Sequence, residues 1–124
     1  MPDQVRLAMP ADPEFLRLAR VTAMGIASRL GFTLDEIEDL RIATDEMCHA
    51  LIGHRGRAGT VELHYTALAG GIEVVGRETT SGARPTNGLS EMSRLVLAAV
   101  TDEHELAVGG ESASFRFVKR KASP

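Results

Sequence analysis

One segment in the first half of the chain gathers side chains that could do chemistry. It places Glu46, Cys48 and His49 within four residues, and His54 follows shortly after. A glutamate can act as a general base or orient an attacking hydroxyl. Glu46 and His49 are three residues apart, so in a helix they would lie on the same face. Carboxylate, imidazole and thiolate groups are also the usual ligands of zinc.

A zinc site at these residues would need a second pair of ligands, which the sequence does not offer. Four-ligand zinc sites usually draw on two separated pairs of ligands, and His64 and His104 fall in predicted strands without a partner motif. We therefore expect no metal site. The single cysteine, Cys48, is best interpreted as a small buried residue of a helix, because nothing near it in sequence indicates a reactive thiol.

A capping box predicts the helix that positions these residues. Thr33 is followed three residues later by Glu36, the pattern in which each side chain caps the backbone of the other residue. The helix should run to about Ile52, and its buried positions recur at helical spacing. The expected buried residues are Ile37, Leu40, Thr44, Met47 and Leu51.

A first helix is expected over residues 13–30 and a third over residues 89–101. Asp12 can cap the first helix, and Gly31 can end it in a left-handed conformation. We expect the first helix to bury Phe15, Leu18, Thr22, Ile26 and Leu30, and the third to bury Leu89, Met92, Val96 and Ala99.

Alternating apolar residues predict strands around these helices, and the polar residues 79–88 predict an exposed loop. Short turns join most neighbouring strands, so the sheet should be largely antiparallel. Helices on one face of it would make an α/β two-layer sandwich. We expect one domain over residues 1–124, with an ordered core over 5–118. The expected strands cover residues 5–9, 60–66, 71–76, 103–108 and 113–118.

The composition of the chain excludes some classes of function and favours one cellular compartment. The net charge of −3 gives no basic field for nucleic acid or anionic lipid, and residues 119–121 should form a solvated end. No signal peptide or membrane-spanning apolar run is visible. A single cysteine favours a reducing compartment. These features predict a cytoplasmic protein without nucleic-acid or membrane partners.

The order of elements and three sequence segments resemble a known family. The strongest segment is DLRIATDEMCHALI from Asp39 to Ile52; ARVT from Ala19 and FVKR from Phe117 also match. Together they resemble the RsbW-type anti-sigma-factor serine kinases of the GHKL, or histidine-kinase-like, ATPase superfamily. The resemblance covers Val5 to Lys119. It implies the histidine-kinase-like ATPase (Bergerat) fold.

The resemblance implies an ATP site with magnesium, and it assigns roles along the second helix. Glu46 matches the glutamate that orients or deprotonates the attacking hydroxyl. Four residues later the family has an asparagine that holds the magnesium ion, whereas this chain has Ala50, which offers no side-chain oxygen. Phosphoryl transfer depends on positioning and charge neutralisation, so this departure bears directly on catalysis.

The other nucleotide motifs of the family are also changed. The aspartate of its Asp-x-Gly-x-Gly motif is matched by Glu78, and one glycine, Gly82, remains there. The glycine-rich lid is reduced to Gly88 and Leu89, and the late Gly-Thr pair becomes Ser112-Ala113. The resemblance therefore predicts these nucleotide-binding residues: Glu46, His49, Ala50, Glu78, Gly82, Gly88, Leu89 and Ala113.

The resemblance also implies protein partners. An arginine matching Arg20 contacts both the sigma factor and its antagonist, so we expect Arg20, with Arg17 and Met24, on a partner-binding surface. The first hypothesis is an anti-sigma-factor-like regulator in a partner-switching system, countered by an anti-anti-sigma factor. The alternative is an active ATP-dependent serine/threonine kinase that phosphorylates this antagonist. The resemblance implies a homodimer.

Overall fold

The computed structural model describes residues 3–53, 56, 58–79, 89–109 and 112–122. The expected loop at residues 79–88 lies outside these ranges except for Thr79, which ends a strand. His54 also lies outside the described residues.

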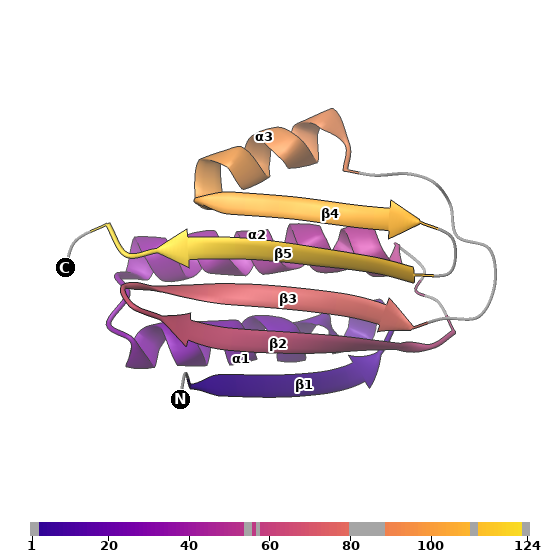
Figure 1. Cartoon of the computed structure of the whole chain (residues 1–124), viewed down its shortest axis with the longest axis horizontal. Coiled ribbons are helices and arrows are strands. Elements are labelled where there is room, and N and C mark those ends of the chain that lie inside the picture. The colour runs from indigo at the N-terminus through magenta and orange to yellow at the C-terminus, as the bar shows by residue number, and fades with distance from the viewer. Residues whose placement is uncertain (1–2, 54–55, 57, 80–88, 110–111, 123–124) are drawn as a thin grey trace.

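The described strands form one antiparallel sheet. Its spatial order is β1-β2-β3-β5-β4, so β5 lies between β3 and β4 (Figure 1). The expected strands are present, and several are longer than expected. The strands are β1 (Gln4–Pro10), β2 (Thr60–Leu68), β3 (Gly71–Thr79), β4 (Glu103–Gly109) and β5 (Ser112–Arg120).

Two helices cover one face of this sheet. A short 3-10 turn over Pro13–Phe15, capped by Asp12, leads into α1 (Leu16–Arg29), and α2 (Leu34–Ile52) follows beside it (Figure 1). The third helix, α3 (Glu91–Val100), lies alongside the edge strand β4. The predicted two-layer α/β sandwich is therefore confirmed. No helix in the described part of the chain has the length and apolar character needed to cross a membrane.

The core lies between the sheet and these helices. Val61, Leu63 and Tyr65 alternate along β2 and are all buried, and Phe115 and Phe117 are buried on β5. In α2 the expected stripe is confirmed except that Ile37 is only partly buried. Its buried members are Leu40, Thr44, Met47 and Leu51.

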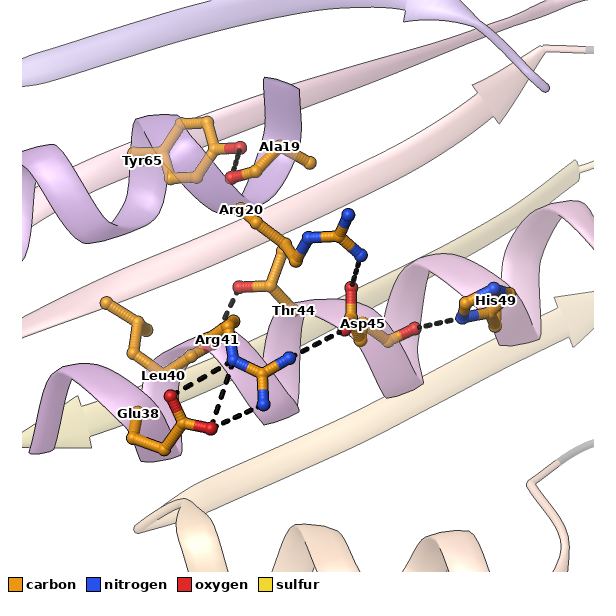
Figure 2. Close-up of polar contacts among 9 residues, drawn as sticks. All are labelled: Ala19, Arg20, Glu38, Leu40, Arg41, Thr44, Asp45, His49 and Tyr65. Carbon is orange, nitrogen blue, oxygen red and sulfur yellow. Dashed lines mark hydrogen bonds and ion pairs between the residues drawn. The ribbon is translucent and has the colours of Figure 1, made fainter. Parts of the chain in front are cut away.

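The prediction for the buried face of α1 is only partly right. Phe15, Ile26 and Leu30 are partly buried and pack against the core, but they do not form its centre. Leu18 is 44% exposed, and the buried positions are Leu16, Ala19, Ala23 and Ala27. Alanine side chains allow the helix backbone to approach β2 closely. The hydroxyl of Tyr65 consequently donates a hydrogen bond of 2.9 Å to the backbone oxygen of Ala19 (Figure 2). A helix face made of alanines gives a weaker hydrophobic pattern in the sequence than the larger apolar residues beside it.

The prediction for α3 is also only partly right. Met92 and Ala99 are exposed, whereas Leu97 and Val100 are buried and Leu89 and Val96 only partly buried. The helix packs against α2 and the edge strand β4, so only a narrow stripe of it is covered.

The basic end of the chain is not a solvated end, contrary to the prediction. The Lys119 ammonium lies 3.0 Å from the Asp39 carboxylate on α2, and the Lys119 side chain is only 13% exposed. The Lys121 ammonium donates a hydrogen bond of 3.0 Å to the Leu30 backbone oxygen at the end of α1. Order therefore extends past the expected limit of residue 118.

The buried carboxylate of Glu36 joins this end of the chain to the start of α2. One carboxylate oxygen accepts the backbone N–H of Thr33 at 2.8 Å, completing the predicted capping box. The other oxygen accepts the backbone N–H of Ala122 at 2.5 Å. These backbone hydrogen bonds, that of Thr33 first, hold the pKa of Glu36 below its ordinary value of 4.5.

We predict that Glu36→Gln lowers the free energy of unfolding by about 1–2 kcal/mol. Glutamine keeps the size of the side chain but replaces one acceptor oxygen with an NH₂ group. That group cannot accept a backbone N–H, so one of the two contacts is lost. Urea denaturation at neutral pH measures the difference between wild type and variant.

The difference in stability between wild type and Glu36→Gln should depend on pH. Because the pKa of Glu36 is lowered in the folded state, its ionised form stabilises the protein fully above about pH 4.5. This contribution is lost as the pH falls through the lowered pKa, so the difference between wild type and Glu36→Gln should shrink in acid. Glu91→Gln, at an exposed carboxylate in the first turn of α3, is the control and should have the smaller effect. A difference that grew on acidification would contradict this assignment.

Candidate functional site

Helix α2 presents candidate residues on two different faces. Asp39, Glu46 and Ala50 recur at spacings of seven and four residues, which places them on one face of the helix. Asp39 pairs with Lys119 of β5, so this face turns toward β5. Asp45 lies on a different face and contacts α1 (Figure 2).

The Asp39–Lys119 ion pair shows which end of the sheet lies nearest to Ala50. Along α2, Ala50 lies about 16 Å beyond Asp39. Along β5, Ala113 lies about 20 Å from Lys119, and Ala113 is in register with Glu78 of β3. Since α2 runs along β5 (Figure 1), its second half lies over the end of the sheet that holds Glu78 and Ala113.

The predicted nucleotide-binding residues are described only in part. Glu78 is a buried carboxylate, 3% exposed, and Ala113 is buried beside it, whereas Glu46, His49 and Ala50 are half-buried. Leu89 is half-buried and packs against the core. Gly82 and Gly88 lie outside the described residues.

An open hollow of about 320 Å³ lies at this end of the sheet. Glu78 and Ala113 are among its lining residues, but Glu46 and Ala50 are not. The resemblance also predicts a cleft, lined by Glu46 and Ala50, between the second helix, the strand at residues 73–78 and residues 79–88. Because residues 80–88 lie outside the described residues, this cleft stays a prediction. The residues that line the hollow are Arg77, Glu78, Thr79, Ser112, Ala113 and Ser114.

His49 makes a contact within its own helix. Its Nδ1 atom lies 3.0 Å from the backbone oxygen of Asp45, a geometry in which the ring nitrogen donates (Figure 2). Within the described part of the chain, no group of three or more His, Cys, Asp or Glu side chains could hold a metal ion. Cys48 is fully buried, and desolvation raises the pKa of its thiol to about 12, so it is unreactive at neutral pH.

The described residues do not fit a magnesium ion at the place that the family motif implies. Magnesium requires oxygen ligands. Ala50 supplies no side-chain oxygen, and His49, the neighbouring polar residue, supplies nitrogen only. Glu46 carries a carboxylate on this face, whereas the carboxylate of its neighbour Asp45 contacts Arg20 and Arg41 on another face.

The other face of α2 carries a network of charged side chains. The Arg20 Nη1 atom on α1 lies 2.9 Å from one carboxylate oxygen of Asp45. The other oxygen lies 3.3 Å from Arg41 Nη1, and Arg41 in turn pairs with Glu38 (Figure 2). Four side chains of alternating charge therefore connect α2 to α1.

Arg20 also belongs to an exposed stripe of α1. Arg17, Arg20 and Met24 are spaced three and four residues apart, so they share one side of the helix. Arg17 is exposed, and Arg20 and Met24 are half-buried beside the alanine face. An open hollow of about 500 Å³ lies at the start of this stripe. It is lined by Pro13, Glu14, Phe15, Arg17 and Arg20.

Sequence reasoning found Arg20 but missed its partners on α2. Arg41 and Asp45 have the spacing of a helical i,i+4 ion pair, which was visible in the sequence. The contact from Asp45 to Arg20 spans 25 residues and depends on how α1 and α2 pack, so no local signal could indicate it.

Comparison with known proteins shows similarity to serine-protein kinases named RsbW. The chain is 37% identical over 76 residues to the serine-protein kinase RsbW of Bacillus subtilis (strain 168), covering 59% of this chain and 48% of that protein. It is 44% identical over 69 residues to the serine-protein kinase RsbW of Listeria innocua, covering 52% and 44%. The chain thus spans about half the length of the curated relatives it matches. No family model matches it.

These similarities confirm the resemblance to RsbW-type kinases that the sequence predicts. The antiparallel sheet with helices on one face agrees with the histidine-kinase-like ATPase fold that this resemblance implies. The relatives are named as kinases, whereas this chain has Ala50 where the family's magnesium-binding asparagine is expected.

Proposed function

We propose that this chain is an anti-sigma-factor-like regulator. It binds a sigma factor through the stripe formed by Arg17, Arg20 and Met24 on α1, and an anti-anti-sigma factor competes for the same surface. The observation that carries this proposal is the state of Arg20. Its side chain is partly exposed beside an open hollow, and its guanidinium forms an ion pair with Asp45.

The physical character of this stripe suits protein binding. Arginine combines a planar group of donors with an apolar stem, and it is enriched among residues that dominate interface energies. Arg17 and Met24 add a second cation and a flexible apolar side chain on the same side of α1. Leu18 and Val21, both exposed, extend the apolar surface of this helix.

The alternative function is an active serine kinase, supported by two observations. The relatives are named serine-protein kinases, and Glu46 is present and half-exposed on the face of α2 that turns toward β5. Ala50 argues against it, because the residue one turn beyond Glu46 cannot bind magnesium. We therefore place regulation by binding first and ATP-dependent catalysis second.

We predict that Arg20→Ala weakens binding of a sigma factor about five- to a hundredfold, the usual range for an important interface arginine. The measurement is calorimetric titration with each purified sigma factor encoded in the same genome. The folding cost should stay within about 1 kcal/mol, because the Arg20–Asp45 pair is partly exposed and Asp45 keeps its contact with Arg41.

Arg29→Ala is the matched control, since Arg29 is a highly exposed arginine at the other end of α1. It should bind like wild type. Equal binding by wild type and Arg20→Ala would remove α1 from the interface. Failure of every sigma factor to bind would refute the proposed function itself.

We further predict little or no magnesium-dependent phosphorylation of purified anti-anti-sigma factors from that genome, because Ala50 cannot coordinate the metal. Transfer of the labelled γ-phosphate of ATP measures this. Ala50→Asn restores a side-chain oxygen and should raise magnesium-dependent ATP binding if the rest of the pocket is intact. Robust phosphorylation by wild type that disappears in Glu46→Ala would instead establish the kinase.

A further inference from the structure

We propose that Asp45 is a positioning residue for the partner-binding surface: it holds Arg20 in its binding orientation, and Arg41 holds Asp45 (Figure 2). This inference rests on the proposed function and deepens it. It adds a residue of α2, outside the α1 stripe, to the determinants of partner affinity.

The carboxylate of Asp45 is fixed from two sides. Its Oδ1 atom accepts from Arg20 Nη1 at 2.9 Å, and its Oδ2 atom accepts from Arg41 Nη1 at 3.3 Å. Because the two arginines come from different helices, rotation of the carboxylate would break one contact or the other. Arg41 is itself restrained, since its Nε atom lies 3.1 Å from both carboxylate oxygens of Glu38.

The contact with Asp45 restrains the Arg20 side chain but uses few of its hydrogen-bond donors. Asp45 engages one terminal nitrogen of the guanidinium rather than two in parallel. An arginine has five N–H donors, so most of the donors of Arg20 stay available to a partner. The Asp45 side chain is 22% exposed and the Arg20 side chain 33%, so water screens this pair less than a fully exposed one.

Restraint before binding should increase affinity. A free arginine side chain samples many rotamers and loses that freedom when it enters an interface. An arginine already held by Asp45 has lost much of it in the unbound protein. Removing the ion pair should therefore weaken partner binding by about three- to tenfold, and only while Arg20 is present to be positioned.

A double-mutant cycle tests this dependence. Wild type, Asp45→Asn, Arg20→Ala and the double variant are titrated with the tightest-binding purified sigma factor. Asp45→Asn should weaken binding three- to tenfold in the wild-type background and cause no further loss in the Arg20→Ala background. Thermal unfolding of each variant shows separately whether the fold is retained.

Two further variants distinguish positioning from a general structural role. Arg41→Gln releases Asp45 without touching Arg20, and it should give a smaller loss that also disappears in the Arg20→Ala background. Glu38→Gln, at the far end of the network, should have the smallest effect and serves as the control. Asp45→Asn leaves the shape of the side chain nearly unchanged, and Arg41→Gln provides the same test should Asp45→Asn fail to fold.

The outcomes separate this inference from the proposed function. Equal losses for Asp45→Asn in both backgrounds, unchanged affinity, or tighter binding would overturn the positioning role while leaving sigma-factor binding intact. Tighter binding would mean that Asp45 competes with the partner for Arg20. Absence of sigma-factor binding by wild type would overturn the proposed function, and the positioning role with it.

Discussion

The ammonium group of Lys119 on β5 lies 3.0 Å from the carboxylate of Asp39 on α2, and Glu36 accepts backbone N–H groups from both Thr33 and Ala122. Together with the buried stripe of Leu40, Met47 and Leu51, these contacts fix the start and the rotation of α2 against the sheet. The positions of the candidate residues follow from them. With this rotation, the face that carries Glu46 and Ala50 turns toward β5, and Asp45 reaches α1. A different rotation of α2 would separate Arg20 from its carboxylate and move Glu46 away from the sheet.

Consecutive residues of a helix point about 100° apart, so Asp45 and Glu46 serve different faces although they are neighbours in sequence. On the Glu46 side, the proposed chemistry would depend on a positioned metal ion, and Ala50 offers no side-chain oxygen to hold one. On the Asp45 side, the contacts to α1 do not depend on a metal ion. A change at Ala50 can therefore affect catalysis without affecting partner binding, which is why we place binding before catalysis.

The sequence predicted the parts of this structure that depend on local rules. The capping box of Thr33 and Glu36, the alternation along β2 and, apart from the partly buried Ile37, the buried stripe of α2 are present. The predictions failed where packing between elements decides the outcome. Larger apolar residues such as Leu18 suggested a different buried face for α1. The residues that are in fact fully buried include three alanines, whose small side chains let the helix pack close to β2. The basic residues after Phe117 suggested a solvated end because their partners lie far away in sequence. The same limit applies to the site: Arg20 and Glu46 could be proposed from the resemblance, but the link from Arg20 to Asp45 required the fold.

The most direct test of this account is the nucleotide dependence of sigma-factor binding. One purified sigma factor is titrated against the wild-type chain without nucleotide and again with saturating ATP and magnesium. If binding depends on the α1 stripe and not on an intact metal site, the two dissociation constants should agree within about twofold, or about 0.4 kcal/mol. Binding that is detectable only with ATP and magnesium, or that becomes tenfold tighter with them, would contradict the account. It would show that the site beside Glu46 and Ala50 still controls the partner surface.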